Sequence, residues 1–103
     1  MEQLHFAFGP GQQQPPHLPQ IVGVVGSGNL EILLEAAALQ GGCEITIATQ
    51  ARGFGAIWQA VLSDFFARWQ PANLRIAIND VGATPAVVGL RLDQAMQAAG
   101  GRT

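Results

Sequence analysis

Five short stretches of the chain have the hydrophobic pattern of β-strands. In the first, Leu4, Phe6 and Phe8 alternate with polar or small residues, the period of a strand with one buried face. The others are an aliphatic run at 21–25 and alternating stretches at 30–34, 43–47 and 74–78. The Ala-rich segment 33–39 permits a helix, but the alternation that begins at Leu30 favours a strand. Gly41-Gly42 lies between two of these stretches, so we expect 30–34 and 43–47 to form a hairpin.

Two further segments have helical periodicity. Between Phe54 and Gln70, apolar residues recur at steps of three and four: Phe54, Ile57, Trp58, Val61, Leu62, Phe65, Phe66 and Trp69. We interpret this stripe as core packing, and expect the helix to stop at Gln70 because Pro71 disfavours a helical residue before it. A second helix is predicted from the cap Thr84-Pro85 to the stop Gly100-Gly101. Gly89 inside it costs about 1 kcal/mol relative to Ala, so we expect something to pack closely there.

This order of elements predicts an α+β fold, a mostly antiparallel sheet of four to five strands with two helices packed on one face. The 103 residues fit a single domain spanning 1–103. Residues 9–20, GPGQQQPPHLPQ, hold four of the six prolines and little to bury, which predicts a flexible loop. Residues 79–82 are predicted to turn the chain between the last strand and the second helix.

Composition excludes several classes of function. The chain has five Arg, no Lys and seven acidic residues, a net charge of −2, and only 12% charged residues, against roughly 25% in an average globular protein. Without Lys or a basic patch we expect no nucleic-acid binding, and Schiff-base and P-loop chemistry are excluded. No apolar run reaches the roughly 18–20 residues of a membrane span, and the acidic start is unlike a signal peptide. We therefore expect a cytoplasmic protein without a membrane partner.

No set of side chains predicts catalysis or a metal site. Cys43 has no partner for an internal disulfide, and His5 and His17 lack metal-ligand spacing. The acidic residues are scattered over different elements, and Asp80 lies in a predicted turn, where Asp commonly bonds its own backbone. A triad of Ser27, His5 and Asp80 is rejected because the glycine two residues before a nucleophile Ser is missing.

The most unusual local feature is the turn Gly26-Ser27-Gly28. Small residues on both sides leave the Ser27 hydroxyl uncovered, and the position directly after a strand places it at the edge of the sheet. A tight turn without further role is the simplest interpretation. A dinucleotide loop is a weaker alternative, because Glu31 replaces its third glycine and no acidic residue ends the following strand to hold a ribose.

The stretch from Val22 to Glu35, VGVVGSGNLEILLE, resembles the prosthetic-group attachment region of the acyl carrier (delta) subunits of malonate decarboxylases. Further similarities are the segment 45–47, the helix entry Gly53-Phe54 with Trp58, and the segment 76–92 with its DVGATP motif. The resemblance covers about residues 4–99, apart from the variable loop. The chain is more distantly similar to the acyl carrier (gamma) subunits of citrate lyases, which share the attachment turn and the later helix start.

The resemblance implies a non-catalytic carrier subunit. Ser27 would carry a 2′-(5″-phosphoribosyl)-3′-dephospho-CoA group through a phosphodiester, Gly26 and Gly28 would expose it, and Cys43 would be a bystander. An alpha subunit would exchange acetyl for malonyl on the thiol of that group. Beta and gamma subunits would then decarboxylate the malonyl thioester back to acetyl, so that malonate becomes acetate and CO2. A prosthetic-group transferase and a malonyl transferase are further implied partners.

One position departs from the family pattern, since Asn29 stands where an Asp is expected. Attachment at Ser27 is unaffected, but a carboxylate that guides the modifying enzyme is missing there. Arg52, Arg75 and Arg91 are open candidates for guiding an anionic arm. An alternative from another class is a small α+β binding or regulatory module whose Gly-Ser-Gly turn binds a phosphate-bearing ligand noncovalently. The two interpretations differ in whether the bound group stays attached to the chain after the protein is denatured.

Overall fold

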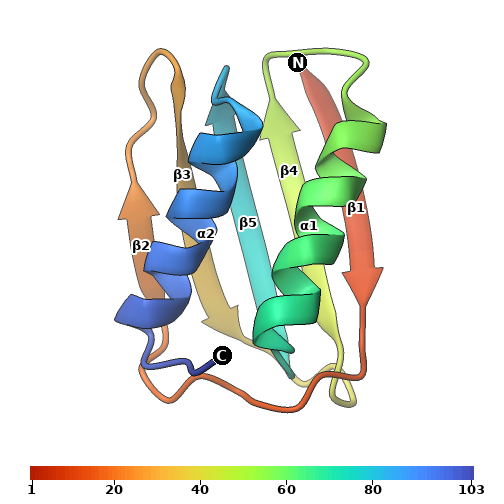
Figure 1. Ribbon diagram of the computed structural model, residues 1–103, viewed down its shortest axis with the longest axis vertical. Coiled ribbons are helices and arrows are strands. Elements are labelled where there is room, and N and C mark those ends of the chain that lie inside the picture. The colour runs from red at the N-terminus through yellow and green to blue at the C-terminus, as the bar shows by residue number, and fades with distance from the viewer.

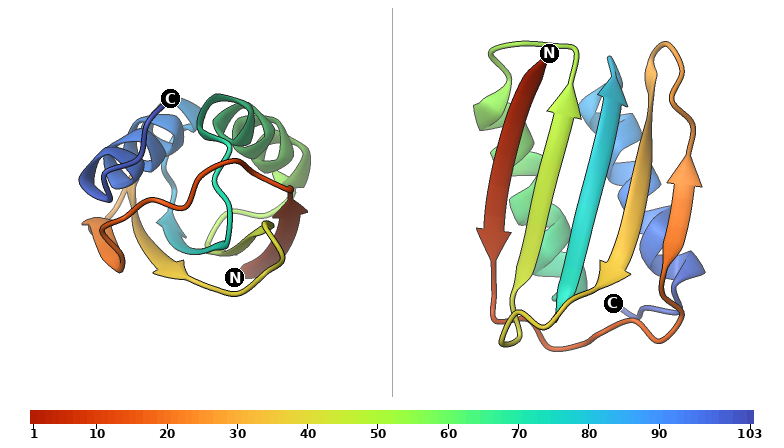
Figure 2. Two further views of the ribbon diagram at one scale, coloured as in Figure 1. Left: turned by 90° about the horizontal axis from the view of Figure 1, so that it is seen from below. Right: turned by 180° about the vertical axis from the view of Figure 1, so that it is seen from behind.

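A computed structural model describes residues 1–103, which form a five-stranded sheet and two helices. The strands are β1 (Glu2–Phe8), β2 (Gln20–Gly23), β3 (Asn29–Ala36), β4 (Cys43–Thr49) and β5 (Leu74–Val81), and the helices are α1 (Gly55–Trp69) and α2 (Pro85–Ala98). Both helices lie on one face of the sheet, and the other face is open (Figures 1 and 2). The predicted α+β fold, with two helices on one face of a mostly antiparallel sheet, is confirmed. Neither helix is long and apolar enough to cross a membrane.

The strand order is β1-β4-β5-β3-β2. β4 and β5 are parallel, with α1 as the crossover between them, and all other neighbours are antiparallel. The predicted hairpin between 30–34 and 43–47 is wrong, because β5 lies between β3 and β4. The chain nevertheless extends as a strand from Asn29 to Ala36, so the strand interpretation of this region is confirmed over the helical one.

β2 and β3 form the hairpin instead, with Val22 opposite Ile32. The turn that closes this hairpin contains Gly26, Ser27 and Gly28. Local sequence gave no sign that β5 would separate β3 from β4, because β5 comes much later in the chain. The predicted turn at 79–82 also starts too early, since Asn79 to Val81 still belong to β5 and the chain turns at Gly82, which has φ +82°.

The core lies between the sheet and the two helices. It contains alternate residues of the three central strands and one side of each helix, 18 buried residues in one cluster that includes Leu30, Ile45, Ile76, Phe65 and Leu92. Trp58, Leu62, Phe65 and Trp69 of α1 are buried, and Val61 and Phe66 are partly buried against the same core. Core packing is therefore confirmed for six of the eight residues of the predicted stripe. Phe54 and Ile57 are the exception, since they remain 46% and 45% exposed at the start of α1.

The helix ends follow their capping residues. α1 ends at Trp69, and Gln70 takes a left-handed conformation with its N–H donating to the Phe66 carbonyl. The Thr84 side chain accepts a hydrogen bond from the Val87 N–H at the start of α2, as predicted. The close packing expected at Gly89 is wrong, because a β-carbon there would meet nothing within 4 Å.

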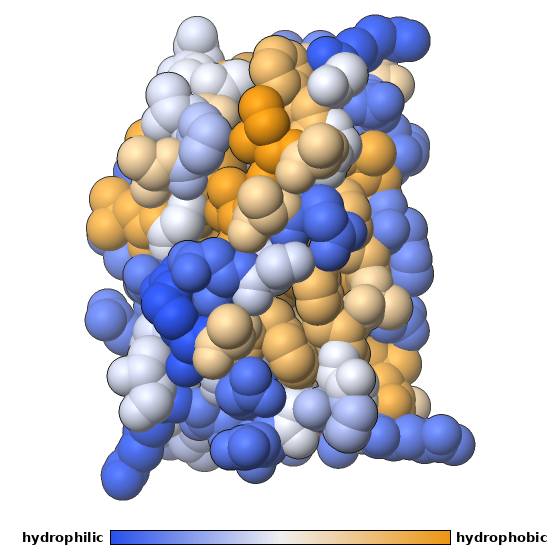
Figure 3. Space-filling view, turned by 45° about the vertical axis from the view of Figure 1, so that its right-hand side comes forward, coloured by the Kyte–Doolittle hydropathy of each residue, from blue (hydrophilic) through white to orange (hydrophobic).

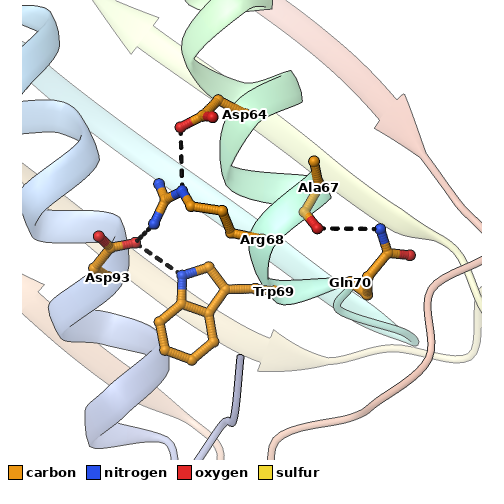
Figure 4. A network of polar contacts seen from close by, with 6 residues as sticks. All are labelled: Asp64, Ala67, Arg68, Trp69, Gln70 and Asp93. Atoms are coloured by element: carbon orange, nitrogen blue, oxygen red, sulfur yellow. Dashed lines mark hydrogen bonds and ion pairs between the residues drawn. The ribbon is translucent and has the colours of Figure 1, made fainter.

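Arg68 joins the two helices near their C-terminal ends (Figure 4). Its Nε donates to Asp64 at 3.1 Å on the same helix, and its Nη1 donates to Asp93 of α2 at 2.6 Å. The indole N–H of Trp69 donates to the same Asp93 oxygen at 2.8 Å. The hydrogen bond to Asp93 raises the pKa of Arg68. This network fixes the helices to each other at the end of the molecule away from Ser27.

Residues 9–20 cross the end of the sheet opposite the Ser27 turn (Figure 1). Backbone hydrogen bonds hold this segment at several points, among them Gly11 N–H to the Gly41 carbonyl at 2.8 Å and His17 N–H to the Ala99 carbonyl at 2.8 Å. The segment also lies close to the chain after α1, since a β-carbon at Gly11 would be 2.1 Å from the Pro71 carbonyl oxygen. The flexibility expected for this segment stays a prediction, and these contacts identify where it is held.

Candidate functional site

Ser27 lies in the exposed turn between β2 and β3. Gly28 has φ +72°, a conformation that favours glycine, and a β-carbon there would meet nothing within 4 Å. Gly26 also has open surroundings, with only a Val24 methyl carbon at 3.8 Å from the position of a β-carbon. The hydrogen bonds of the turn are made by the neighbours of Ser27 and not by its side chain. The hydroxyl is therefore free to meet another molecule.

Backbone hydrogen bonds hold the turn in one shape. The Asn29 N–H donates to the Gly26 carbonyl at 2.9 Å, and the Gly28 N–H donates to the Val81 carbonyl at the end of β5 at 2.7 Å. At the start of the turn, Gly23 has φ +89° and approaches Leu30 so closely that a β-carbon would be 2.1 Å from its carbonyl oxygen. The hairpin thus presents Ser27 on a backbone that is anchored to the sheet.

Arg91 of α2 is the candidate cation that contacts this hairpin. Its Nε donates to the Asn29 side-chain oxygen at 3.3 Å, and its Nη1 donates to Gln94 at 2.8 Å. None of the ion pairs in the structure involves Arg91, so no carboxylate neutralises it. Arg75 lies toward the far end of the sheet, opposite Glu35 of β3, and Arg52 is exposed in the loop between β4 and α1.

Asp80 is a buried carboxylate near the turn, only 4% exposed at the end of β5. One oxygen accepts from the Thr49 hydroxyl at 2.8 Å and from the Gly82 N–H at 3.3 Å, and the other accepts from the Ala83 N–H at 3.0 Å. The predicted bonding of Asp80 to nearby backbone is confirmed. In addition, its contact with Thr49 ties β4 and β5 to the start of α2, which local sequence could not show.

Changing Asp80 to Asn is expected to destabilise the fold by about 2 kcal/mol, because the new amide N–H2 group faces donors and leaves one or two of them unpaired. Urea unfolding of the wild type and the variant measures this difference. Asp64→Asn is the matched control, since Asp64 is exposed and meets only Arg68; we expect a loss below about 0.5 kcal/mol there. Equal losses at the two positions would contradict the structural role of Asp80.

An open pocket of about 270 Å³ lies between the starts of the two helices and the end of β5. Its walls are mostly apolar and include Phe54, Ile57, Trp58, Val61, Ala83 and Val88. Apolar side chains cover much of the upper part and the centre of the face in Figure 3. Sequence reasoning missed this pocket because it assigned Phe54 and Ile57 to the core with the rest of their stripe. The available signal was that these two residues lie at the very beginning of the helix.

The other residues considered for chemistry lie apart from the turn. His5 is on β1 and Ser27 follows β2, which are opposite edge strands, so the structure does not assemble a triad with Asp80. His17 lies in the segment that crosses the other end of the sheet. Cys43 is buried at the start of β4, and this burial, together with the nearby charge of Glu44, raises its pKa to about 12.

Cys43 is expected to resist thiol reagents in the folded protein. Burial raises the pKa of the Cys43 thiol to about 12, so very little thiolate is present at pH 8, and burial blocks access as well. Labelling with Ellman's reagent at pH 8 should therefore be very slow in the folded protein and should rapidly reach one equivalent in guanidinium chloride. Rapid labelling of the folded protein at pH 8 would contradict the buried position.

Comparisons with known proteins give consistent results. The family model of the malonate decarboxylase delta subunit (MdcD) matches residues 18–99, which include the Ser27 turn. A malonate decarboxylase acyl carrier protein of Burkholderia cepacia is 58% identical over 95 residues, 92% of this chain and 87% of that protein. Another, from Xanthomonas axonopodis pv. citri (strain 306), is 67% identical over 76 residues, 74% of this chain and 72% of its own.

The fold also matches a solved structure. A chain in the crystal structure of a Pseudomonas malonate decarboxylase hetero-tetramer in complex with malonate superposes with a TM-score of 0.86 at 41% sequence identity. The match covers 97% of this chain and 100% of that chain. The similarity therefore includes both layers of the fold and both ends of the sheet.

Proposed function

The chain belongs to the malonate decarboxylase delta subunit (MdcD) family, the acyl carrier proteins of malonate decarboxylase, and from this premise we propose that Ser27 is its attachment point for a prosthetic group. The group is 2′-(5″-phosphoribosyl)-3′-dephospho-CoA, joined through a phosphodiester to the Ser27 hydroxyl. When bound, it supplies a thiol that carries acetyl or malonyl as a thioester.

The observation that carries this proposal is a free serine hydroxyl on an anchored glycine turn. A modifying enzyme must reach the hydroxyl, and open space around Gly28 permits that approach. The hydrogen bond from the Gly28 N–H to Val81 holds the turn still while the large group is attached. The residues therefore fit a bulky, covalently attached group, which a buried or hydrogen-bonded serine would not.

Arg91 suits the negative charge of such a group. Its guanidinium contacts Asn29, two residues after Ser27, and has no carboxylate partner. A cation next to the turn would attract a phosphodiester by charge and by hydrogen bonds. We propose Arg91 over Arg52 and Arg75 as the residue that orients the phosphate, because neither of the others contacts the turn.

The chain's own part in the reaction is to present the group and not to catalyse. Backbone hydrogen bonds of Gly28 and Asn29 hold the turn that presents Ser27. Partner subunits then supply the catalysis. An alpha subunit exchanges acetyl for malonyl on the thiol, and beta and gamma subunits decarboxylate the malonyl thioester. The hetero-tetrameric composition of the Pseudomonas malonate decarboxylase supports such an assembly. A prosthetic-group transferase and a malonyl transferase complete the proposed set of partners, in the cytoplasm.

The test is the intact mass of the protein under denaturing conditions, after production together with its own neighbouring genes. We expect a mass increase that corresponds to the phosphoribosyl-dephospho-CoA group, and peptide mapping should locate it at Ser27. A covalent group survives denaturation, whereas a noncovalent ligand does not. An unmodified mass in the presence of active modifying enzymes would reject the carrier function and favour a module that binds a phosphate-bearing ligand reversibly.

A further inference from the structure

The pocket at the start of the helices is connected to the Ser27 turn through one strand end. The Gly28 N–H donates to the Val81 carbonyl at 2.7 Å, and the next residue, Gly82, lines the pocket. Asn29 also forms an isolated bridge with Gly82. A group attached to Ser27 through a long arm therefore starts at the same end of β5 as this pocket.

The lining of the pocket selects for an uncharged ligand. Asp80 is its one charged residue, and both Asp80 oxygens already accept hydrogen bonds from Thr49, Gly82 and Ala83. No Arg lines the pocket. Arg52 is next in sequence to the lining residue Ala51, but Arg52 is exposed and is not part of the lining. A ligand carboxylate would lose its hydration there without gaining a cation, and would also lie near the negative charge of Asp80.

Trp58 is the candidate hydrogen-bond donor of the pocket. The other tryptophan, Trp69, donates its indole N–H to Asp93. Trp58 lines the pocket and makes no side-chain hydrogen bond within the chain. No buried side-chain nitrogen or oxygen in the structure lacks a hydrogen-bond partner, so the unpaired indole N–H of Trp58 is accessible from outside, and an amide or thioester oxygen would serve as its acceptor. The volume of about 270 Å³ exceeds the roughly 150 Å³ cavity that accepts a benzene molecule, so the end of a flexible chain fits.

We propose that this pocket binds the uncharged, thiol-bearing end of the arm on Ser27 and releases that end when it carries a carboxylate. The inference rests on the proposed function, since it needs the arm. An acetyl-loaded arm would be held in the pocket, away from water, whereas a malonyl-loaded arm would stay outside, where a partner subunit can reach it. The pocket thus distinguishes the two loaded states by charge.

Two alkyl groups of nearly equal size, here called caps, are placed on the thiol of the arm to test the selection by charge. The arm's thiol in the modified protein is alkylated with iodoacetamide, which adds a neutral amide, or with iodoacetate, which adds a carboxylate; the protected Cys43 does not compete. The Trp69→Phe variant leaves Trp58 as the single fluorophore. We expect acrylamide to quench Trp58 more weakly with the neutral cap, because the anionic cap lowers pocket occupancy at least about tenfold.

Pocket filling provides the matched pair of variants. Ala83→Leu, added to Trp69→Phe, fills the pocket and should remove the difference between the caps, whereas Ala67→Leu, at an exposed position on α1, should keep it. Thermal unfolding verifies that each variant is folded. The comparison of the two caps in the Trp69→Phe variant does not depend on whether Ala83→Leu or Ala67→Leu folds.

The intact mass separates the possible failures. If the mass shows the arm and its cap but Trp58 is quenched equally with both caps and in the unmodified chain, the pocket proposal is wrong and the carrier function stands. Equal protection by both caps would overturn the selection by charge. A chain that lacks the arm, although its modifying enzymes are active, would reject the carrier function and this inference with it.

Discussion

Changing Ser27 to Ala is expected to abolish attachment of the prosthetic group completely while the protein keeps its fold. The side chain is exposed and makes no hydrogen bond within the chain, so its loss removes no packing. No other hydroxyl lies in the turn that the modifying enzyme would recognise. Intact mass spectrometry of the co-produced variant should show only the unmodified chain, and urea unfolding should change by less than about 0.5 kcal/mol.

The chain offers a matched control for this experiment. Its one other serine, Ser63, is also exposed and lies on α1, where its hydroxyl accepts a hydrogen bond from Gln59 at 3.1 Å. The Ser63→Ala variant should be modified to the same extent as the wild type. A full mass increase in Ser27→Ala, or its loss in Ser63→Ala, would place the attachment site elsewhere.

The largest loss of stability is expected from Gly23→Ala, at about 3 kcal/mol or more. The left-handed backbone at φ +89° strains any residue with a β-carbon. In addition, the β-carbon would lie 2.1 Å from the Leu30 carbonyl oxygen, so β2 must move away from β3. Urea unfolding measures the loss, and slower attachment of the group to the variant is expected because the hairpin presents Ser27.

The Gly28→Ala variant separates two costs in the free energy of unfolding of Gly23→Ala, the left-handed backbone and the close approach to Leu30. Gly28 also has a left-handed backbone, at φ +72°, but its β-carbon would have open space. We expect this variant to lose about 1 kcal/mol, the cost of the backbone conformation alone. If the two variants lose the same free energy of unfolding, the contact between Gly23 and Leu30 does not limit the hairpin.

The sequence predicted the elements better than their arrangement. Each strand and helix has its own period and its own stop signals, such as Pro71 after α1 and Thr84 before α2, and these are local properties of the chain. The pairing of β3 with β5 was missed, because it depends on a strand that follows about forty residues later. Gly41-Gly42 marked a turn correctly but could not identify which strand would be the neighbour.

The candidate site was predicted in the same uneven way. Two flanking glycines were sufficient to mark Ser27 as exposed, because this depends only on neighbours in the chain. The contact between Arg91 and Asn29, the link from Asp80 to Thr49, and the pocket all join residues that are remote in sequence. Such features follow from the folded arrangement, and no local pattern encodes them.

The Ser27 turn and the C-terminus lie at opposite ends of a molecule whose longest dimension is 31 Å (Figure 1). The N-terminus, in contrast, lies at the same end as the turn. A biosensor surface or an affinity tag should therefore be joined through the C-terminus, which leaves the turn directed toward solution. Immobilisation through the N-terminus would place the support at the same end of the molecule as Ser27 and weaken the measured binding of partner subunits.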